Sequence, residues 1–201
     1  TVTAVSTYTT AASTPSASLF PGTTLAEGDG TGAFNYWKST ASTFELLGMA
    51  DAGSYITYTN SAMAATWPIS FGYSNMDTYS GNALISSLSG PANGTIYTTA
   101  QGTGTLILPG SLTFTNVLQI GIYNNLTMDL GGTFTVNIAS FENQYYHGTQ
   151  KFPLFSLQYE RQTLTSIFGP TVTLTYSLKA NNAIILGVNE ATFDKNFVVY
   201  P

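Results

Sequence analysis

The sequence predicts an all-β protein, and three observations support that prediction. Short runs rich in Thr, Val, Ile, Tyr and Phe alternate with Gly, Pro, Asn and Ser along most of the chain. No stretch shows the 3.6-residue period of an amphipathic helix. The connections between runs are short, which favours antiparallel pairing. We therefore expect an antiparallel β-sandwich or jelly-roll-like body with an extended N-terminal strand.

The elements are expected in the following order. Residues 13–22 contain two prolines and several serines, which is typical of an extended connector. Strands are expected at 43–48, 54–59, 68–73, 82–88, 94–100, 104–108, 111–115, 117–123, 126–130, 133–141, 152–159, 171–179, 183–188 and 196–200. Turn signals separate them at 109–110, 124–125, 131–132 and 181–182. We divide the chain into an N-terminal strand with its connector, residues 1–22, and a β-sandwich body, residues 23–201.

The composition excludes several functions. Only 7% of the 201 residues are charged, against about 25% in ordinary soluble domains. The five Lys and Arg residues are too few and too scattered to bind nucleic acid. Because there is no cysteine, disulfides, thiolate nucleophiles and Cys-ligated zinc are excluded. A surface of Thr, Ser, Asn, Gln, Gly and Tyr suits a secreted β-domain, and its low charge also favours lateral association.

Export is also expected from the targeting signals. The N-terminus lacks a basic and then apolar leader, so we expect a mature extracellular form whose signal peptide has been removed. The longest apolar run, 183–188, is too short to span a bilayer. Two sequons, at Asn93 and Asn125, agree with export and predict N-linked glycans in exposed turns. The alternative is that both are ordinary turn asparagines.

Candidate catalytic residues are sparse. The single histidine, His147, lies in a turn-like segment and is expected at the surface. Glu27 and Asp29 share a glycine-rich turn but lack the further oxygen ligands of a calcium loop. Asp129 and Glu142 are isolated on strand-like stretches. With no phosphate loop or nucleophile elbow, we expect no enzyme, no cofactor and no metal.

The N-terminal segment, TVTAVSTYTTAAS, has the character of a strand. Val2, Ala4 and Tyr8 fall on one face and Val5 on the other. An ordered strand must find partners for its backbone groups. It can fold back as an edge strand of its own domain, or add to the sheet of another copy. The second option makes a head-to-tail contact, which builds open filaments. The C-terminal residues 196–201 could be donated instead, although the N-terminal connector is longer.

These traits resemble the subunits of donor-strand-complemented surface filaments, in particular the threads of thermoacidophilic archaea. The resemblance lies in the low charge, the Thr-, Ser-, Tyr- and Asn-rich body, the sequons, the absence of cysteine and the N-terminal strand. It implies a structural, glycosylated, non-enzymatic subunit of a cell-surface appendage. Its donor strand would contain Val2, Ala4, Val5 and Tyr8, and its partners would be other copies of itself and N-linked glycans.

A second resemblance implies a different class of function. The segment LGMADAGSYITYTN, residues 47–60, is similar to part of family 6-type carbohydrate-binding modules. The matching residues are Asp51, Gly53, Tyr55, Ile56 and Tyr58. Such modules hold sugars on exposed aromatic rings, for which Tyr36, Trp37 and Trp67 are available. This alternative expects a secreted carbohydrate-binding module or adhesin domain whose N-terminal strand packs on its own sheet.

Overall fold

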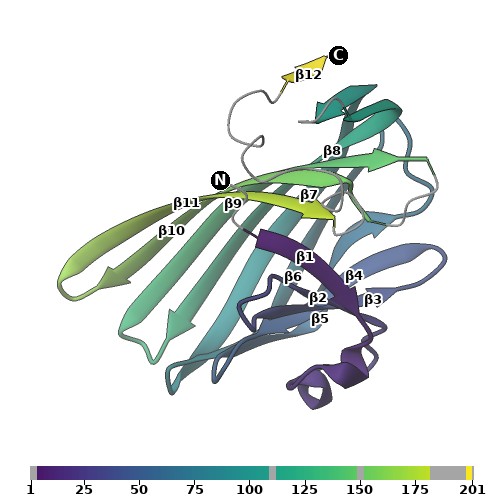
Figure 1. Cartoon of the computed structure of the whole chain (residues 1–201). Coiled ribbons are helices and arrows are strands. Elements are labelled where there is room, and N and C mark those ends of the chain that lie inside the picture. Colours follow the sequence, from purple (N-terminus) through teal and green to yellow (C-terminus); the bar gives the residue numbers. More distant parts are fainter. Residues whose placement is uncertain (1–3, 109–111, 149–151, 182–197, 201) are drawn as a thin grey trace.

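The computed structural model describes residues 4–108, 112–148, 152–181 and 198–200. It contains twelve β-strands in one sheet (Figure 1). The first six are β1 (Ala4–Thr9), β2 (Leu25–Gly28), β3 (Phe34–Ser39), β4 (Thr43–Ala50), β5 (Tyr55–Thr66) and β6 (Ser74–Ile85). The others are β7 (Leu88–Leu108), β8 (Leu112–Leu130), β9 (Phe134–His147), β10 (Phe155–Ser166), β11 (Gly169–Asn181) and β12 (Val198–Tyr200). In these described residues the helical segments are two short 3-10 helices, Ala11–Ser13 and Ala17–Leu19.

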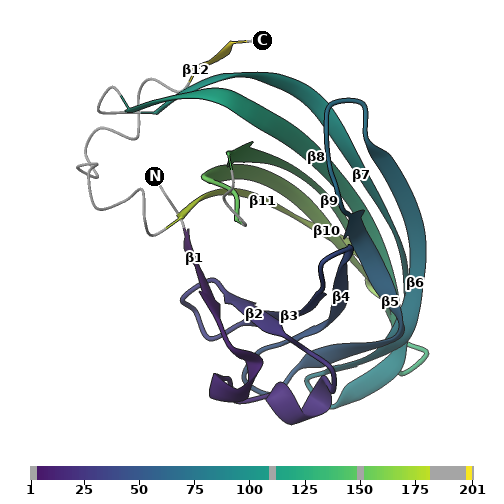
Figure 2. The same ribbon diagram turned by 90° about the vertical axis from the view of Figure 1, so that its right-hand side faces the viewer.

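The sheet curves round until it is nearly barrel-shaped. The strand order is β12-β7-β6-β5-β4-β3-β2-β1-β11-β10-β9-β8, and β7 also pairs with β8. Figure 2 shows the curvature, with β1 lying between β2 and β11. The β1–β11 contact is parallel, whereas β1 and β2 are antiparallel. The all-β, antiparallel class is therefore confirmed.

The sheet is single and curved, where the sequence favoured two stacked layers. Two features account for the curvature. First, β7 contains register shifts against β8 between Ala100 and Gly102 and between Gly104 and Leu106, and such bulges bend and twist a strand. Second, the pairing of β1 with β11 joins segments from the two ends of the sequence. The larger buried cluster lies on the concave side of the sheet, and a second one, which includes Leu106, Val117, Tyr145 and Phe155, packs on the other face at one end of β8 to β10.

Several expected elements differ from those observed. Residues 68–73 form a turn, in which the Tyr73 N–H donates to the Ser70 carbonyl at 3.0 Å. The expected strands between 94 and 130 merge into β7 and β8, and the Asn124–Asn125 pair lies inside β8. β2 and β3 were not expected. The Gly131–Gly132 turn is confirmed, whereas 109–110 and 183–188 lie outside the described residues.

The connector between β1 and β2 is folded and not extended. Its two 3-10 turns place Phe20 against the outer face of β2, β3 and β4. Phe20 is 3% exposed and stacks on Tyr36 with ring centroids 4.0 Å apart. Ala26 and Ala50 complete this small outer cluster. The connector is thereby held on the same sheet that contains β1.

The main core fills one side of the concave interior. It is formed by buried side chains of β4 to β9, including Leu46, Ile56, Tyr79, Ile96 and Leu126. Where Tyr79 reaches the interior, its hydroxyl donates to Asn124 Oδ1 at 2.6 Å. The interior beside β1, β2, β10 and β11 carries polar side chains instead, and this division positions the site described next.

Candidate ligand-binding cavity

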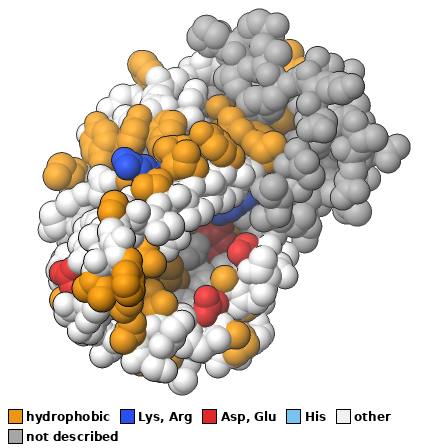
Figure 3. All heavy atoms as spheres, turned by 90° about the vertical axis from the view of Figure 1, so that its left-hand side faces the viewer, with side chains coloured by type: hydrophobic (Ala, Val, Ile, Leu, Met, Phe, Trp, Pro, Cys, Tyr) orange, Lys and Arg blue, Asp and Glu red, His pale blue; other side chains and the backbone are white. Residues whose placement is uncertain are grey.

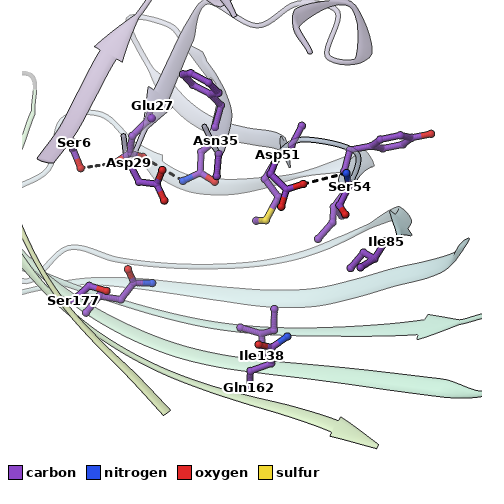
Figure 4. Close-up of a pocket in the computed structure, with 18 of the residues that line it drawn as sticks. Ser6, Glu27, Asp29, Asn35, Asp51, Ser54, Ile85, Ile138, Gln162 and Ser177 are labelled. Atoms are coloured by element: carbon purple, nitrogen blue, oxygen red, sulfur yellow. Dashed lines mark hydrogen bonds between the residues drawn. The ribbon is translucent and has the colours of Figure 1, made fainter. Parts of the chain in front are cut away.

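An open cavity of about 340 Å³ lies between the two walls of the curved sheet. One wall is formed by β1 to β5 and the turns between them, and the other by β6 and β8 to β11 (Figure 4). Figure 3 shows the hollow, with charged side chains gathered in and around it. Its polar lining includes Ser6, Glu27, Asp29, Asn35, Asp51, Ser54, Gln158, Gln162, Ser177 and Lys179. Its apolar lining includes Phe34, Met49, Tyr55, Ile56, Ile85, Met128 and Ile138.

Glu27 is the centre of a hydrogen-bond network in the wall formed by β1 to β5. β2 alternates outward Ala26 with inward Glu27, so that the carboxylate faces the interior. Trp37 Nε1 donates to Glu27 Oε2 at 3.2 Å, and Asn35 Nδ2 donates to the same oxygen at 3.5 Å. From β1, Ser6 and Tyr8 donate to Glu27 Oε1 at 3.3 and 3.4 Å. One carboxylate therefore connects β1, β2 and β3 at the edge of the cavity.

The turns at the rim hold two further carboxylates in fixed positions. Asp29 Oδ1 accepts hydrogen bonds from the Thr31 N–H at 2.8 Å and its hydroxyl at 2.6 Å. Burial raises the pKa of Asp29, but the Thr31 hydrogen bonds, with smaller contributions from a backbone N–H and the Lys179 charge, together hold the pKa below its ordinary value. Asp51 Oδ1 accepts from the Ser54 N–H at 3.1 Å (Figure 4). Both carboxylates keep further lone pairs for a ligand.

The opposite wall carries polar groups without protein partners. Gln158, Gln162 and Ser177 line the cavity, and their side chains have no hydrogen-bond partner in the part of the chain that the structure describes. They lie on β10 and β11, where Gln158 pairs with Ser177 across the ladder. Their donors and acceptors are free to bind a molecule in the cavity.

Lys179 supplies the positive charge of the interior. It lines the cavity and also a smaller space with Tyr8, Glu27 and Glu142. Burial raises the pKa of Glu142; Lys179 opposes this shift and Glu27 adds to it. Burial likewise raises the pKa of Glu160, again opposed by Lys179. The ammonium therefore stabilises the ionised form of both glutamates.

The arrangement is suited to binding. Among the described residues no group of three or more His, Cys, Asp or Glu side chains could hold a metal ion. Glu27 and Asp29 lie on one short strand and the turn after it, where both oxygens of Glu27 and the Oδ1 of Asp29 accept hydrogen bonds from neighbouring residues. The expectation of a non-enzymatic protein stays a prediction.

The residues proposed for a donor strand lie at the closing position of the sheet. Ala4 pairs with Lys179 and Val5 with Ala180, while Val2 lies outside the described residues. Tyr8 faces the interior, where its ring stacks on Phe152 with centroids 3.8 Å apart. Burial, then the nearby Glu27 carboxylate, raises the Tyr8 pKa. In the single chain this strand thus fills a place in its own sheet.

Both sequon asparagines are in strands, which corrects the expectation of turns. Asn93 lies within β7 and Asn125 within β8, and both are exposed. The two sequons face each other in the ladder, because Asn93 pairs with Thr127 and Thr95 with Asn125. The runs around them continue as strands because β6 and β9 pair along the same residues. Glycosylation itself stays a prediction.

Only some of the residues that suggested a carbohydrate-binding module lie at the cavity. Asp51, Tyr55 and Ile56 line the cavity. Tyr36 is 0% exposed beneath Phe20, so the expectation that it is available for stacking on a sugar is wrong. Trp37 stacks on Phe44 at 4.3 Å and donates to Glu27. Trp67, exposed, is not among the lining residues.

Outside the cavity, His147 ends β9 and packs edge-on against Phe114, with ring centroids 5.6 Å apart. It is half-buried.

Sequence reasoning missed the central role of Glu27 and the polar side of the interior. The signal that could have found the latter is the alternation of β11. Its even-numbered positions, from Val172 to Leu178, are apolar, and Thr171, Thr173, Thr175, Ser177 and Lys179 are polar. On this strand the polar face is the one turned inward, toward the cavity.

No protein-family model matches this chain, and no curated protein or solved structure is found to be similar to it. None of the helical segments that the structure describes has the length and apolar character needed to cross a membrane.

Proposed function

We propose that this chain is a binding module that holds a small, neutral, sugar-like molecule in the open cavity. The observation that carries the proposal is the pair of opposed walls, one with fixed carboxylates and the other with unpaired Gln158, Gln162 and Ser177. The volume, about 340 Å³, lies at the small end of the roughly 300–1,000 Å³ range of ligand sites.

The lining chemistry matches a polyhydroxylated ligand. Each sugar hydroxyl can both donate and accept, so it can donate to Asp29 or Asp51 and accept from the Gln158 or Gln162 amide. The apolar floor, which includes Ile85 and Ile138, can cover the C–H face of a pyranose ring (Figure 4). Three lining carboxylates against one lysine disfavour phosphorylated or acidic ligands.

The test is calorimetric titration against a panel of neutral mono- and disaccharides, with the double variant Gln158→Leu/Gln162→Leu. Leucine has a similar volume to glutamine, and no described hydrogen bond is lost in the protein, so the fold should persist. At about 0.5–1.5 kcal/mol per hydrogen bond, losing two should weaken binding roughly 5- to 150-fold.

The control is Asn137→Leu, which likewise replaces an amide by leucine, on the exposed face of β9 and away from the cavity lining. It should bind the sugar as the wild type does. The proposal fails if no sugar in the panel binds the wild-type chain, or if the double variant binds as tightly as the control.

A second candidate is the filament subunit that donates its N-terminal strand. The observation that favours it is the short closing contact: β1 is joined to β11 through Ala4, Val5 and Ser6, and to β2 through Thr7, Tyr8 and Thr9. An element held by so few pairs can exchange with the same element of another copy. The exchanged strand would occupy the same place in the neighbour's sheet.

A cysteine cross-link distinguishes the two candidates, because the chain has no cysteine of its own. Thr9 pairs directly with Ala26, a geometry compatible with a disulfide. After oxidation, the double variant Thr9→Cys/Ala26→Cys should run as a monomer on a non-reducing gel if β1 stays in the sheet of its own chain. A ladder of covalent oligomers would support strand donation instead. A second test applies if the full-length chain polymerises: deletion of residues 1–12 should then leave only monomers if the N-terminal strand is the donated one.

Both candidates place the protein outside the cell. The support is the low charge, the absence of cysteine and the two exposed sequons at Asn93 and Asn125. A glycan on either residue would project from the outer face of β7 and β8 and hydrate it. Intact-mass measurement on protein from its natural source tests this, since a mass of 21.4 kDa would correspond to the bare polypeptide.

A further inference from the structure

A continuous row of large side chains crosses the outer face of the sheet, one from each strand between β6 and β11. We call it the outer aromatic row. Its members are Met76, Tyr97, Tyr123, Phe141, Tyr159 and Tyr176. Each is the direct cross-strand partner of the next, so the row runs perpendicular to the strands. It lies on the opposite side of the sheet from the cavity, because neighbouring residues such as Ile96 and Ile122 face the core.

The rings touch along much of the row; four of its members are exposed to solvent, and Phe141 and Tyr159 are half-buried. Tyr123 stacks on Phe141 at 4.4 Å, and Tyr159 lies 5.1 Å from Tyr176. Tyr97 and Tyr123 are 39% and 43% exposed, and Tyr176 is 70% exposed. Cross-strand aromatic pairs stabilise a sheet modestly, but a contiguous exposed apolar strip marks a surface that contacts something else.

Neutral amides flank the row. Gln119 Nε2 donates to Gln101 Oε1 at 3.2 Å and to Asn143 Oδ1 at 3.0 Å. Gly121 is the next residue of β8 on the same face as Tyr123. The Gln101 side chain lies over Gly121, where a Cβ would collide with it. On the other side of Tyr123 lies the exposed amide of Asn125. Around Tyr123 the row is therefore bordered by hydrogen-bonding groups that carry no charge, whereas Arg161, two residues after Tyr159 on β10, places an exposed positive charge on the same face.

We propose that the outer aromatic row binds an extended, neutral polysaccharide chain laid across the strands. Sugar rings present apolar C–H faces to aromatic side chains and hydroxyls to amides, and this strip offers both along one line. The row spans roughly 24 Å, since neighbouring strands lie about 4.8 Å apart, which is long enough for several sugar units. The net charge of −5 disfavours polyanions. This surface is separate from the cavity.

The test is affinity electrophoresis of chain produced without glycosylation, so that Asn125 carries no sugar. The gels contain hydroxyethylcellulose, galactomannan or laminarin as neutral polymers, and alginate as an acidic one. The wild type should be retarded in at least one neutral gel and unaffected by alginate. The double variant Tyr97→Thr/Tyr123→Thr should weaken that binding at least tenfold, because it removes two adjoining rings.

Threonine keeps a strand-forming residue at both positions, and circular dichroism checks that the variant is folded. Phe168→Thr is the control, since Phe168 is a 93% exposed aromatic outside the row. The control should be retarded like the wild type, and so should the cavity variant Gln158→Leu/Gln162→Leu. The proposal is overturned if no neutral polymer retards the wild type, if the folded double variant is retarded equally, or if sedimentation shows the row buried by self-association that the double variant abolishes.

Discussion

Phe20 gives the sharpest test of how the connector is held. The side chain is 3% exposed and stacks on Tyr36 at 4.0 Å, so Phe20→Ala removes nearly a whole buried ring. Such truncations cost about 3–5 kcal/mol. The Tyr36 hydroxyl is buried without a hydrogen-bond partner among the described residues, and water entering the vacated space would offset part of the loss. We therefore expect a loss near the lower end, about 3 kcal/mol.

Urea unfolding followed by circular dichroism measures this loss, and calorimetry should show Tm falling by roughly 6–12 °C, at about 2–4 °C per kcal/mol for a chain of this size. The matched control is Leu19→Ala, because the adjacent Leu19 is 39% exposed and outside the cluster. That variant should lose under about 1 kcal/mol. If Phe20→Ala lost no more than the control, the docking of the connector on β2 to β4 would be refuted.

Three further predictions concern single residues. Gly48→Ala should lower the free energy of unfolding by about 2–6 kcal/mol, because a Cβ would collide with the Ile56 carbonyl and because the backbone φ of 152° is strained for alanine. An unchanged urea-unfolding curve would contradict this. Glu27→Gln should lower the free energy of unfolding by about 1–3 kcal/mol, because it weakens the hydrogen bond that Trp37 Nε1 donates to this side chain. An unchanged Trp37 indole N–H resonance in NMR spectra would contradict this weakening. The folded-state pKa of Glu142 is raised, so the unfolded chain loses this proton more readily than the folded one. The stability of the fold therefore declines as the pH rises above the pKa that Glu142 has in the unfolded chain. Glu142→Gln should thus exceed the wild type in stability at pH 7 and match it below about pH 4; an advantage that persisted in acid would contradict this.

The sequence predicted the fold class because alternation and turn residues are local signals. β4, β5, β9, β10 and β11 lie close to their expected positions. β6 was misplaced because its sequence, SNMDTYSGNALI, is rich in polar residues and has a low intrinsic strand propensity. It forms a strand because β5 and β7 pair with it on both sides. Closure of the sheet by β1 and β11 depends on residues far apart in sequence, which no local pattern reveals.

The candidate site was harder to predict for a related reason. The alternation of β11 is plain in the sequence, but a polar face is ordinarily assigned to solvent. Here Ser177 and Lys179 face the cavity because the sheet curves round them. In the sequence, Glu27 stands out only as one of two acidic residues in a glycine-rich turn. Its bonds to Trp37 and Ser6 depend on the pairing of β2 with β3 and β1, neither of which was expected.

The most direct test of the cavity is an NMR titration that follows side-chain amide resonances while the tightest-binding neutral sugar of the panel is added. The cavity proposal predicts that the amide signals of Gln158, Gln162 and Asn35 shift and saturate together. Those of Gln101 and Gln119, on the outer face, should stay in place. Shifts confined to Gln101 and Gln119, or no saturable shift at Gln158 and Gln162, would contradict it.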